Sequence, residues 1–155
     1  MQLIAARTAQ EFNSRKERKG AFWDDRYHAT AVQTDSHLAR CMTYIDLNMV
    51  RARVVQHPGD WDISGYSEIQ KPWKRKSVID FERLMNFLNV KSQSALASLQ
   101  SKLINEEITN TRRDATWTES VAVGDERYLQ ELKSTLGARG IHRRISSAND
   151  AWTLR

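Results

Sequence analysis

The chain has 155 residues, of which 40% are hydrophobic and 28% charged, a composition typical of a globular protein and not of a disordered one. No apolar run approaches the roughly 18 residues that a membrane span needs, so we expect no membrane partner. Cys41 is the single cysteine, which excludes a disulfide framework and a cysteine-based zinc site and favours a cytoplasmic location.

Positive charge is distributed unevenly along the chain. The net charge is +5, which allows a polyanionic partner without requiring one. Residues 1–76 hold 13 basic and 9 acidic side chains, against 11 and 10 in residues 77–155. The excess therefore lies in the first half, where it is most concentrated in the segments NSRKERKG and KPWKRK.

Residues 2–17 are rich in good helix formers, which predicts a helix that ends before Gly20. A short basic run precedes that glycine and consists of Arg15, Lys16, Arg18 and Lys19. Such a run is either a solvated helix end or a set of phosphate contacts, and the pattern leaves both interpretations open.

Residues 26–33 alternate in polarity and are rich in Tyr, Thr and Val, which predicts a strand. Phe22 and Trp23 come shortly before it, next to several cations. These two rings either stack on nucleic-acid bases or pack into a core, and packing is the commoner outcome. We expect one or two strands in this region, within a fold that is α+β and mainly α-helical.

Residues 36–55 predict one amphipathic helix, bounded by a Thr-Asp-Ser segment before it and a His-Pro-Gly segment after it. Tyr44 and Asn48 are four residues apart, so they share a face of this helix, and Arg40 and Arg51 flank them. A phenol, a carboxamide and cations on one face could act together on a phosphate. The alternative is a surface helix with a half-buried tyrosine and a solvated polar flank.

Residues 70–76 are polar and basic and contain the second of only two prolines, so they are the best candidate for a domain boundary. The predicted division is residues 1–70 and residues 71–155, the second being a helical accessory region. Its predicted helices lie at residues 78–88, 94–108 and 125–136. The polar, basic residues 142–155 predict a loose tail.

Several kinds of site are not indicated by the sequence. None of the four histidines forms an H-x-H or H-E-x-x-H pair, so a self-contained metal site is not expected. Glycine-rich phosphate loops and a G-x-S-x-G nucleophile turn are also missing. A chain that acts alone on nucleotides, sugars or esters therefore has no support.

Three blocks occur in order along the first half: FNSRKERKGAFWDDRYHATAV, then YIDLNMVRARVV, then HPGDWDISGY. Together they resemble the C-terminal half of the IS200-like transposases, most closely the REP-associated tyrosine transposases. The resemblance covers about residues 10–70. The later segment WTESVAVGDERYLQEL also resembles the tail of longer members of that group. One departure is Met49, where the family usually has proline.

The resemblance implies a partner, a reaction and site residues. The partner is single-stranded or hairpin DNA, and Tyr44 matches the nucleophile that cleaves and rejoins a DNA strand through a phosphotyrosine. Asn48 matches a ligand of a divalent metal, Mg²⁺ or Mn²⁺. The cations expected to contact DNA are Arg15, Lys16, Arg18, Lys19, Arg26, Arg40 and Arg51.

The family's metal-binding H-x-H pair lies N-terminal to these blocks, and this sequence does not contain it. We therefore expect the C-terminal half of a transposase, with an incomplete metal site. One alternative is a non-enzymatic DNA-binding or regulatory module that uses the basic segments. Another is self-association through the edge of the strand at residues 26–33.

Overall fold

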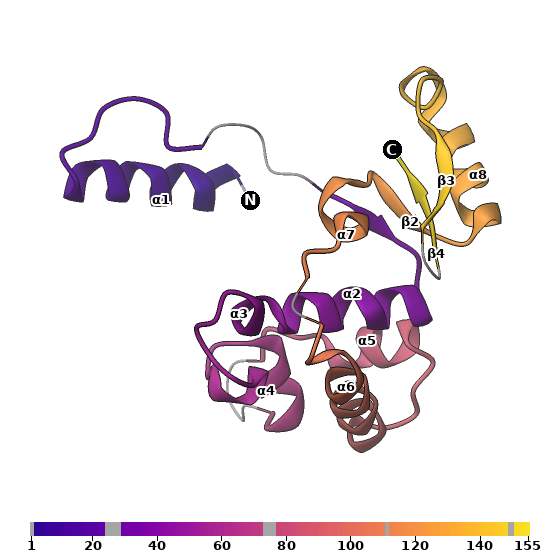
Figure 1. Cartoon of the computed structure of the whole chain (residues 1–155), viewed down its shortest axis with the longest axis horizontal. Helices are drawn as coiled ribbons and strands as arrows, with labels where there is room; N and C mark the ends of the chain where they lie inside the picture. The colour runs from indigo at the N-terminus through magenta and orange to yellow at the C-terminus, as the bar shows by residue number, and fades with distance from the viewer. Residues whose placement is uncertain (1, 24–28, 73–76, 111, 149–150) are drawn as a thin grey trace.

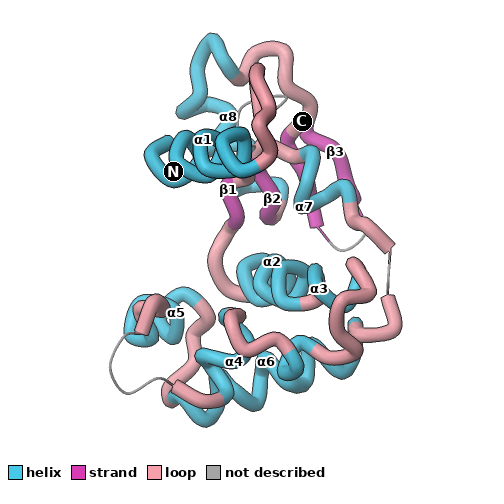
Figure 2. Tube along the Cα trace, turned by 90° about the vertical axis from the view of Figure 1, so that its left-hand side faces the viewer, coloured by secondary structure: helices cyan, strands magenta, loops and turns pink. Residues whose placement is uncertain are grey.

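The protein forms an α+β fold in which a helical layer and a small sheet lie side by side (Figure 1). The computed structural model describes residues 2–23, 29–72, 77–110, 112–148 and 151–155. The predicted class, α+β and mainly α-helical, is confirmed. Figure 2 shows the sheet above the helical layer, with β1 and the loop after it leading from one to the other.

Helix α1 (Gln2–Arg15) begins the chain and lies apart from the other elements, with its C-terminal end pointing away from them (Figure 1). The two aromatic residues that follow it fold back onto it. The ring centroids of Phe22 and Phe12 are 4.8 Å apart, and Trp23 donates from Nε1 to the carbonyl oxygen of Ala5 at 3.1 Å. Phe22 therefore packs on α1, while the Trp23 side chain keeps 51% of its surface exposed.

In the described residues, the helical layer contains α2 (Ser36–Asp46), α3 (Asn48–Arg51), α4 (Gly65–Gln70), α5 (Phe81–Phe87) and α6 (Gln93–Glu107), with a 3-10 turn η1 at Pro58–Asp60. Helix α2 packs against α6. Ala39, Ile69 and Leu96 are buried in one cluster, and Leu47 and Ile104 are buried in a second. Ala39 of α2 belongs to the first cluster and Leu47, directly after α2, to the second. Apolar burial therefore holds α2 in the layer at two points.

The single helix predicted for residues 36–55 is wrong in two respects. Leu47 separates α2 from α3, and the helical path ends at Arg51. Arg53 then takes a left-handed backbone angle, φ 58°, while Val54 N–H bonds to the carbonyl of Met49. This is the Schellman motif, which satisfies the last free carbonyls of a helix and stops it. Periodicity did not reveal it because glycine, its usual residue, is absent here.

The sheet has the strand order β1-β2-β4-β3. Its strands are β1 (Ala31–Val32), β2 (Ala122–Gly124), β3 (Ile145–Ala148) and β4 (Ala151–Leu154). Strand β1 is parallel to β2, and β2 and β3 are each antiparallel to β4. Helices α7 (Ala115–Glu119) and α8 (Glu126–Leu136) flank β2, and η2 (Gly137–Arg139) follows α8. Leu129 of α8 is fully buried with Ala122 and Leu154.

The loose tail predicted for residues 142–155 is wrong, because β3 and β4 form a hairpin there. Ala151, Thr153 and Leu154 are buried, and β4 pairs with β2. The polar composition of this segment did not predict the two strands, because the apolar surface that covers β4 belongs to α8 and β2. The helical description of residues 71–155 is incomplete for the same reason, since three of the four strands lie there.

The strand predicted at residues 26–33 is present as Ala31–Val32, and residues 24–28 lie outside the described part. Elements on the two sides of residue 70 pack together: β1 pairs with β2, and α2 and α4 pack on α6. The buried carboxylate of Glu68 also accepts hydrogen bonds from Ser77 Oγ and from the backbone N–H groups of Val78 and Ile79. These bonds hold the chain beyond residue 76 against α4.

Candidate functional site

Tyr44 lies in the last turns of α2, half-buried, with the side chain of Arg51 packed on it. The guanidinium carbon of Arg51 is 4.0 Å from the centroid of the Tyr44 ring, a cation–π contact. Nη1 of Arg51 also donates to the Tyr44 carbonyl oxygen at 2.7 Å and to Asn48 Oδ1 at 2.8 Å. The carbonyls of a last helical turn lack partners within the helix, so Arg51 satisfies one of them.

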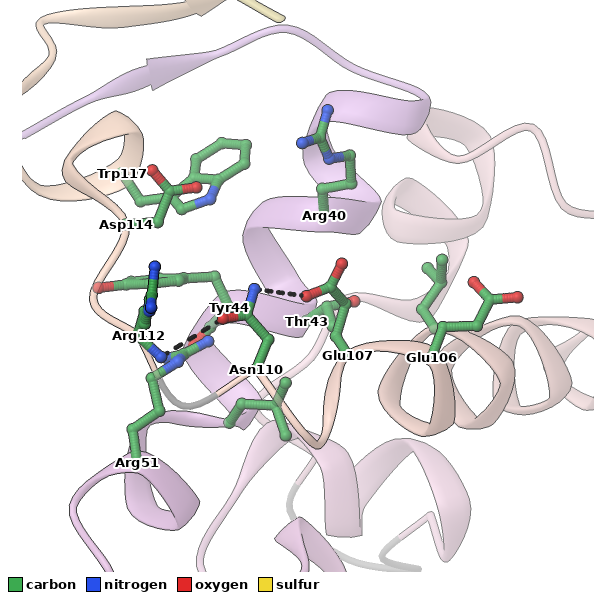
Figure 3. Close-up of a pocket in the computed structure, with 12 residues that line it drawn as sticks. Arg40, Thr43, Tyr44, Arg51, Glu106, Glu107, Asn110, Arg112, Asp114 and Trp117 are labelled. Atoms are coloured by element: carbon green, nitrogen blue, oxygen red, sulfur yellow. Dashed lines mark hydrogen bonds between the residues drawn. The ribbon is translucent and has the colours of Figure 1, made fainter. Parts of the chain in front are cut away.

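Tyr44 and Arg51 line a cavity of about 620 Å³ between α2 and the segment that follows α6 (Figure 3). The first half of the chain contributes one wall and the second half the other. The lining residues are Arg40, Thr43, Tyr44, Leu47, Arg51, Leu103, Glu106, Glu107, Asn110, Arg112, Asp114 and Trp117. A volume of this size is within the range of small-molecule sites, roughly 300–1,000 Å³.

The cavity mixes both signs of charge, with three arginines and three carboxylates. Burial lowers the pKa of the Arg51 guanidinium, while Tyr44, Glu107 and Asp114 act in the opposite direction through space. Arginine stays protonated at physiological pH despite such a shift. Figure 3 shows Arg51 and Arg112 on the Tyr44 side of the cavity, with Glu106 and Glu107 toward the other side. Asp114 also lies on the Tyr44 side, beside Trp117, so two arginines and one carboxylate surround the phenol.

The far wall is fixed by hydrogen bonds around α7. Asp114 caps this helix by accepting from the Thr116 backbone N–H at 2.9 Å. Thr30 Oγ1, just before β1, donates to the carbonyl of Ser120 at 2.6 Å. These bonds hold Trp117, whose ring centroid is 6.4 Å from that of Tyr44 with an interplanar angle of 35°.

The structure brings three of the predicted site residues together in the cavity, keeps Asn48 next to them through Arg51, and places the basic run elsewhere. Tyr44, Arg40 and Arg51 line the cavity, whereas the exposed Asn48 is not among the described residues that do so. The basic run is exposed at the end of α1 and the turn after it, away from α2 (Figure 1). Its members are Arg15, Lys16, Arg18 and Lys19. Arg26 lies outside the described residues.

The predicted metal ligand is not in a metal-binding setting. The side-chain oxygen of Asn48 accepts from Arg51, a cation that disfavours a second positive charge beside it. Within the described ranges, no group of three or more His, Cys, Asp or Glu side chains lies close enough together to hold a metal. The described residues therefore do not fit a divalent ion on their own, and no chemical step below is assigned to one.

Arg112, Asp114 and Trp117 were not predicted as site residues. The sequence DATWTE carries a recognisable signal for α7, an aspartate N-cap before a short helix. It carries no signal that this helix faces Tyr44, because that depends on how β1 pairs with β2 and on where α6 ends.

A second, mostly apolar hollow of about 470 Å³ lies on another side of α2 and contains Asp46. Its carboxylate accepts from Gln100 Nε2 at 2.8 Å, and Gln70 Nε2 donates in turn to Gln100 Oε1 at 2.9 Å. Burial raises the pKa of Asp46 to about 6, against the smaller opposite effect of hydrogen bonds from Gln100 and from the Tyr66 backbone. Asp46 therefore links α2 to α6 through the buried Gln100, which Gln70 of α4 also contacts.

No helix in the described ranges has the length and apolar character to cross a membrane. The chain matched no protein-family model, no curated protein and no solved structure in the comparisons made. The family resemblance of the three sequence blocks is therefore a basis for a proposal and not an assignment.

Proposed function

We propose that this chain is a DNA-binding protein of the tyrosine transposase type, in which Tyr44 attacks a phosphodiester of single-stranded or hairpin DNA. The observation that carries the proposal is the position of Tyr44 in a cavity together with Arg40, Arg51 and Arg112. Arginine is well suited to bind phosphate oxygens, and a cavity concentrates this charge where an exposed surface would not.

In the proposed reaction the Tyr44 phenolate oxygen forms a bond to phosphorus as the bond from phosphorus to the 3′ oxygen breaks. The protein then carries a 5′-phosphotyrosine. The phenol releases its proton to solvent, and the leaving 3′ oxygen takes one proton from solvent to become a free hydroxyl. The covalent bond conserves the energy of the broken linkage, so the reverse attack by a 3′ hydroxyl rejoins the strand. The neighbouring arginines stabilise the charge that develops on the phosphate.

The test is a search for a covalent adduct. The full chain is incubated with a labelled hairpin-ended single-stranded DNA, with and without Mg²⁺ or Mn²⁺, and resolved by denaturing gel electrophoresis. We expect a labelled protein band that Tyr44→Phe abolishes. Tyr128→Phe, a half-buried tyrosine of α8, serves as the matched control and should keep the band. An adduct that survives in Tyr44→Phe would contradict the assignment of the nucleophile.

A non-enzymatic DNA-binding protein is the second candidate, and the placement of Asn48 favours it. Its oxygen is held by Arg51, and the described residues do not form a metal site around it. This candidate requires salt-sensitive DNA binding without an adduct under any metal condition. The adduct assay separates the two candidates. The dependence of DNA affinity on salt concentration reports the phosphate contacts that both of them require.

A further inference from the structure

We propose that the cavity beside Tyr44 holds one nucleotide unit of a single-stranded nucleic acid, with its base stacked on Trp117 and its phosphate bound by Arg51 and Arg112. This inference deepens the proposed function and rests on its DNA-binding part, but not on strand cleavage. It gives the second half of the chain a defined role, because Arg112 and Trp117 lie beyond residue 71.

The base contact is inferred from the position of Trp117. Its ring is half-buried and lines the cavity on the same side as Tyr44 (Figure 3). The two rings are tilted by 35° with centroids 6.4 Å apart, so they form an aromatic corner and not a tight stack. Exposed aromatic faces beside cations are what single-strand binding proteins offer to bases, since every base has a π-face.

The phosphate contact is inferred from the arginines. Nε of Arg51 is buried and has no hydrogen-bond partner among the described residues, although its Nη1 makes two bonds. A buried donor without an acceptor is uncommon, and a phosphate oxygen would satisfy it. Arg112 is exposed on the same side of the cavity and has no ion pair with a described carboxylate.

The carboxylates limit how much polyanion the cavity accepts. Glu106 and Glu107 line it away from the Tyr44 side, and their negative charge repels a second phosphate there. Asp114 lies beside Trp117 on the Tyr44 side, where the two arginines of the phosphate contact outnumber this one carboxylate. One phosphate near the arginines and one base near Trp117 therefore match the charge pattern better than a run of phosphates does. This arrangement requires an unstacked base, which a single strand or a hairpin loop provides and a regular duplex does not.

The test compares two fluorescently labelled DNA probes of ten nucleotides at one salt concentration: oligothymidylate and an abasic strand of the same length. Fluorescence anisotropy gives the affinity for each. We expect the unaltered protein to bind oligothymidylate about tenfold more tightly. Trp117→Leu should bring this ratio close to one, while Trp117→Phe should keep most of it. Trp61→Leu is the matched control, since Trp61 is partly exposed and is not among the residues that line the cavity, and it should leave the ratio unchanged.

Arg112→Gln tests the phosphate contact separately. It should weaken the binding of both probes by the same factor and lower the dependence of log affinity on log salt by about one unit. A base preference that persists in Trp117→Leu would overturn the inference, and so would equal binding of the two probes by the unaltered protein. In the latter case salt-sensitive binding would leave the proposed function standing. Failure to bind either probe at low salt would remove both proposals.

Discussion

Two regions of the molecule carry the cations that were expected to contact DNA, and they differ in how those cations are held. In the cavity, Arg51 contacts the ring and carbonyl of Tyr44 and the amide of Asn48. In the basic turn (residues 15–19), Arg15 forms an ion pair of 3.6 Å with Glu11, and both side chains are about 70% exposed. Arg18 donates to the carbonyl of Ala21, a contact between two exposed residues.

This difference separates two kinds of binding. Exposed cations on a projecting helix end attract any polyanion and release counterions without selecting a sequence or a strand form. Cations fixed beside aromatic rings in a hollow select for shape, because the ligand has to enter. If the proposed function holds, we expect the basic turn to supply general attraction and the cavity to supply selection. We order four predictions from the largest to the smallest expected change in unfolding free energy, and the last of them measures DNA binding as well.

The largest expected effect is that of Arg51→Ala. It removes two charge-assisted hydrogen bonds and a cation–π contact, so the free energy of unfolding should fall by about 2–3 kcal/mol. Urea denaturation followed by circular dichroism measures it. Arg127→Ala is the control, since its ion pair with Glu131 is exposed and should change stability by less than about 0.5 kcal/mol. Equal losses of unfolding free energy in the two variants would show that the Arg51 contacts stabilise the fold no more than an exposed ion pair does.

The second-largest expected effect is a dependence of stability on pH that comes from Asp46 in α2. The folded-state pKa of Asp46 is raised to about 6, above that of the unfolded chain. The folded protein therefore holds this proton more tightly, and the contribution of Asp46 to stability falls as pH rises from about 4 to 7. Relative to Asp46→Asn, the unaltered protein should lose about 2 kcal/mol over that range. A constant difference between the two proteins would show that Asp46 is not desolvated.

Asn48→Ala should have a smaller effect, about 0.5–1 kcal/mol, because Arg51 keeps its contacts with Tyr44 and the lost acceptor is exposed. The same variant addresses metal dependence. If Asn48 does not hold an ion, any adduct formed on Tyr44 should require the same Mg²⁺ concentration in the variant as in the unaltered protein. A higher Mg²⁺ requirement in Asn48→Ala would show that Asn48 does contribute to a metal site.

The smallest change in stability, within about 0.5 kcal/mol, is expected when all four cations of the basic turn become glutamine. DNA affinity should nevertheless fall, and the slope of log affinity against log salt should decrease by about three units. The preference for oligothymidylate over the abasic strand should stay the same. A change in that preference would mean that the basic turn, and not the cavity, reads the base.

The helices were predictable where a local pattern decides them. Helices α5 and α6 have an apolar stripe together with a side-chain cap, Asp80 and Ser92 respectively, each accepting from a backbone N–H. The hairpin of β3 and β4 was not predictable, because its buried face is completed by α8 and β2. Whether a short polar segment forms a strand depends on such distant partners.

The candidate site was predictable on one wall only. Tyr44, Arg40 and Arg51 are close in sequence, so helical spacing brings them together. Asn48 does not line the cavity, although its Oδ1 accepts from the same Arg51 Nη1 that donates to the Tyr44 carbonyl oxygen. Arg112 and Trp117 reach Tyr44 across more than 60 residues, and their approach depends on tertiary packing that no local spacing encodes.

The parallel pairing of Ala31 with Ala122 and of Val32 with Val123 has a consequence for how the chain is made. The entire helical layer is synthesised between these two strands, roughly 90 residues, which takes several seconds at about 5–20 residues per second. During that interval β1 has no neighbouring strand, while α2 to α6 already possess their own apolar partners. Vectorial synthesis therefore lets the helical layer fold first and makes closure of the sheet a late, high-contact-order event.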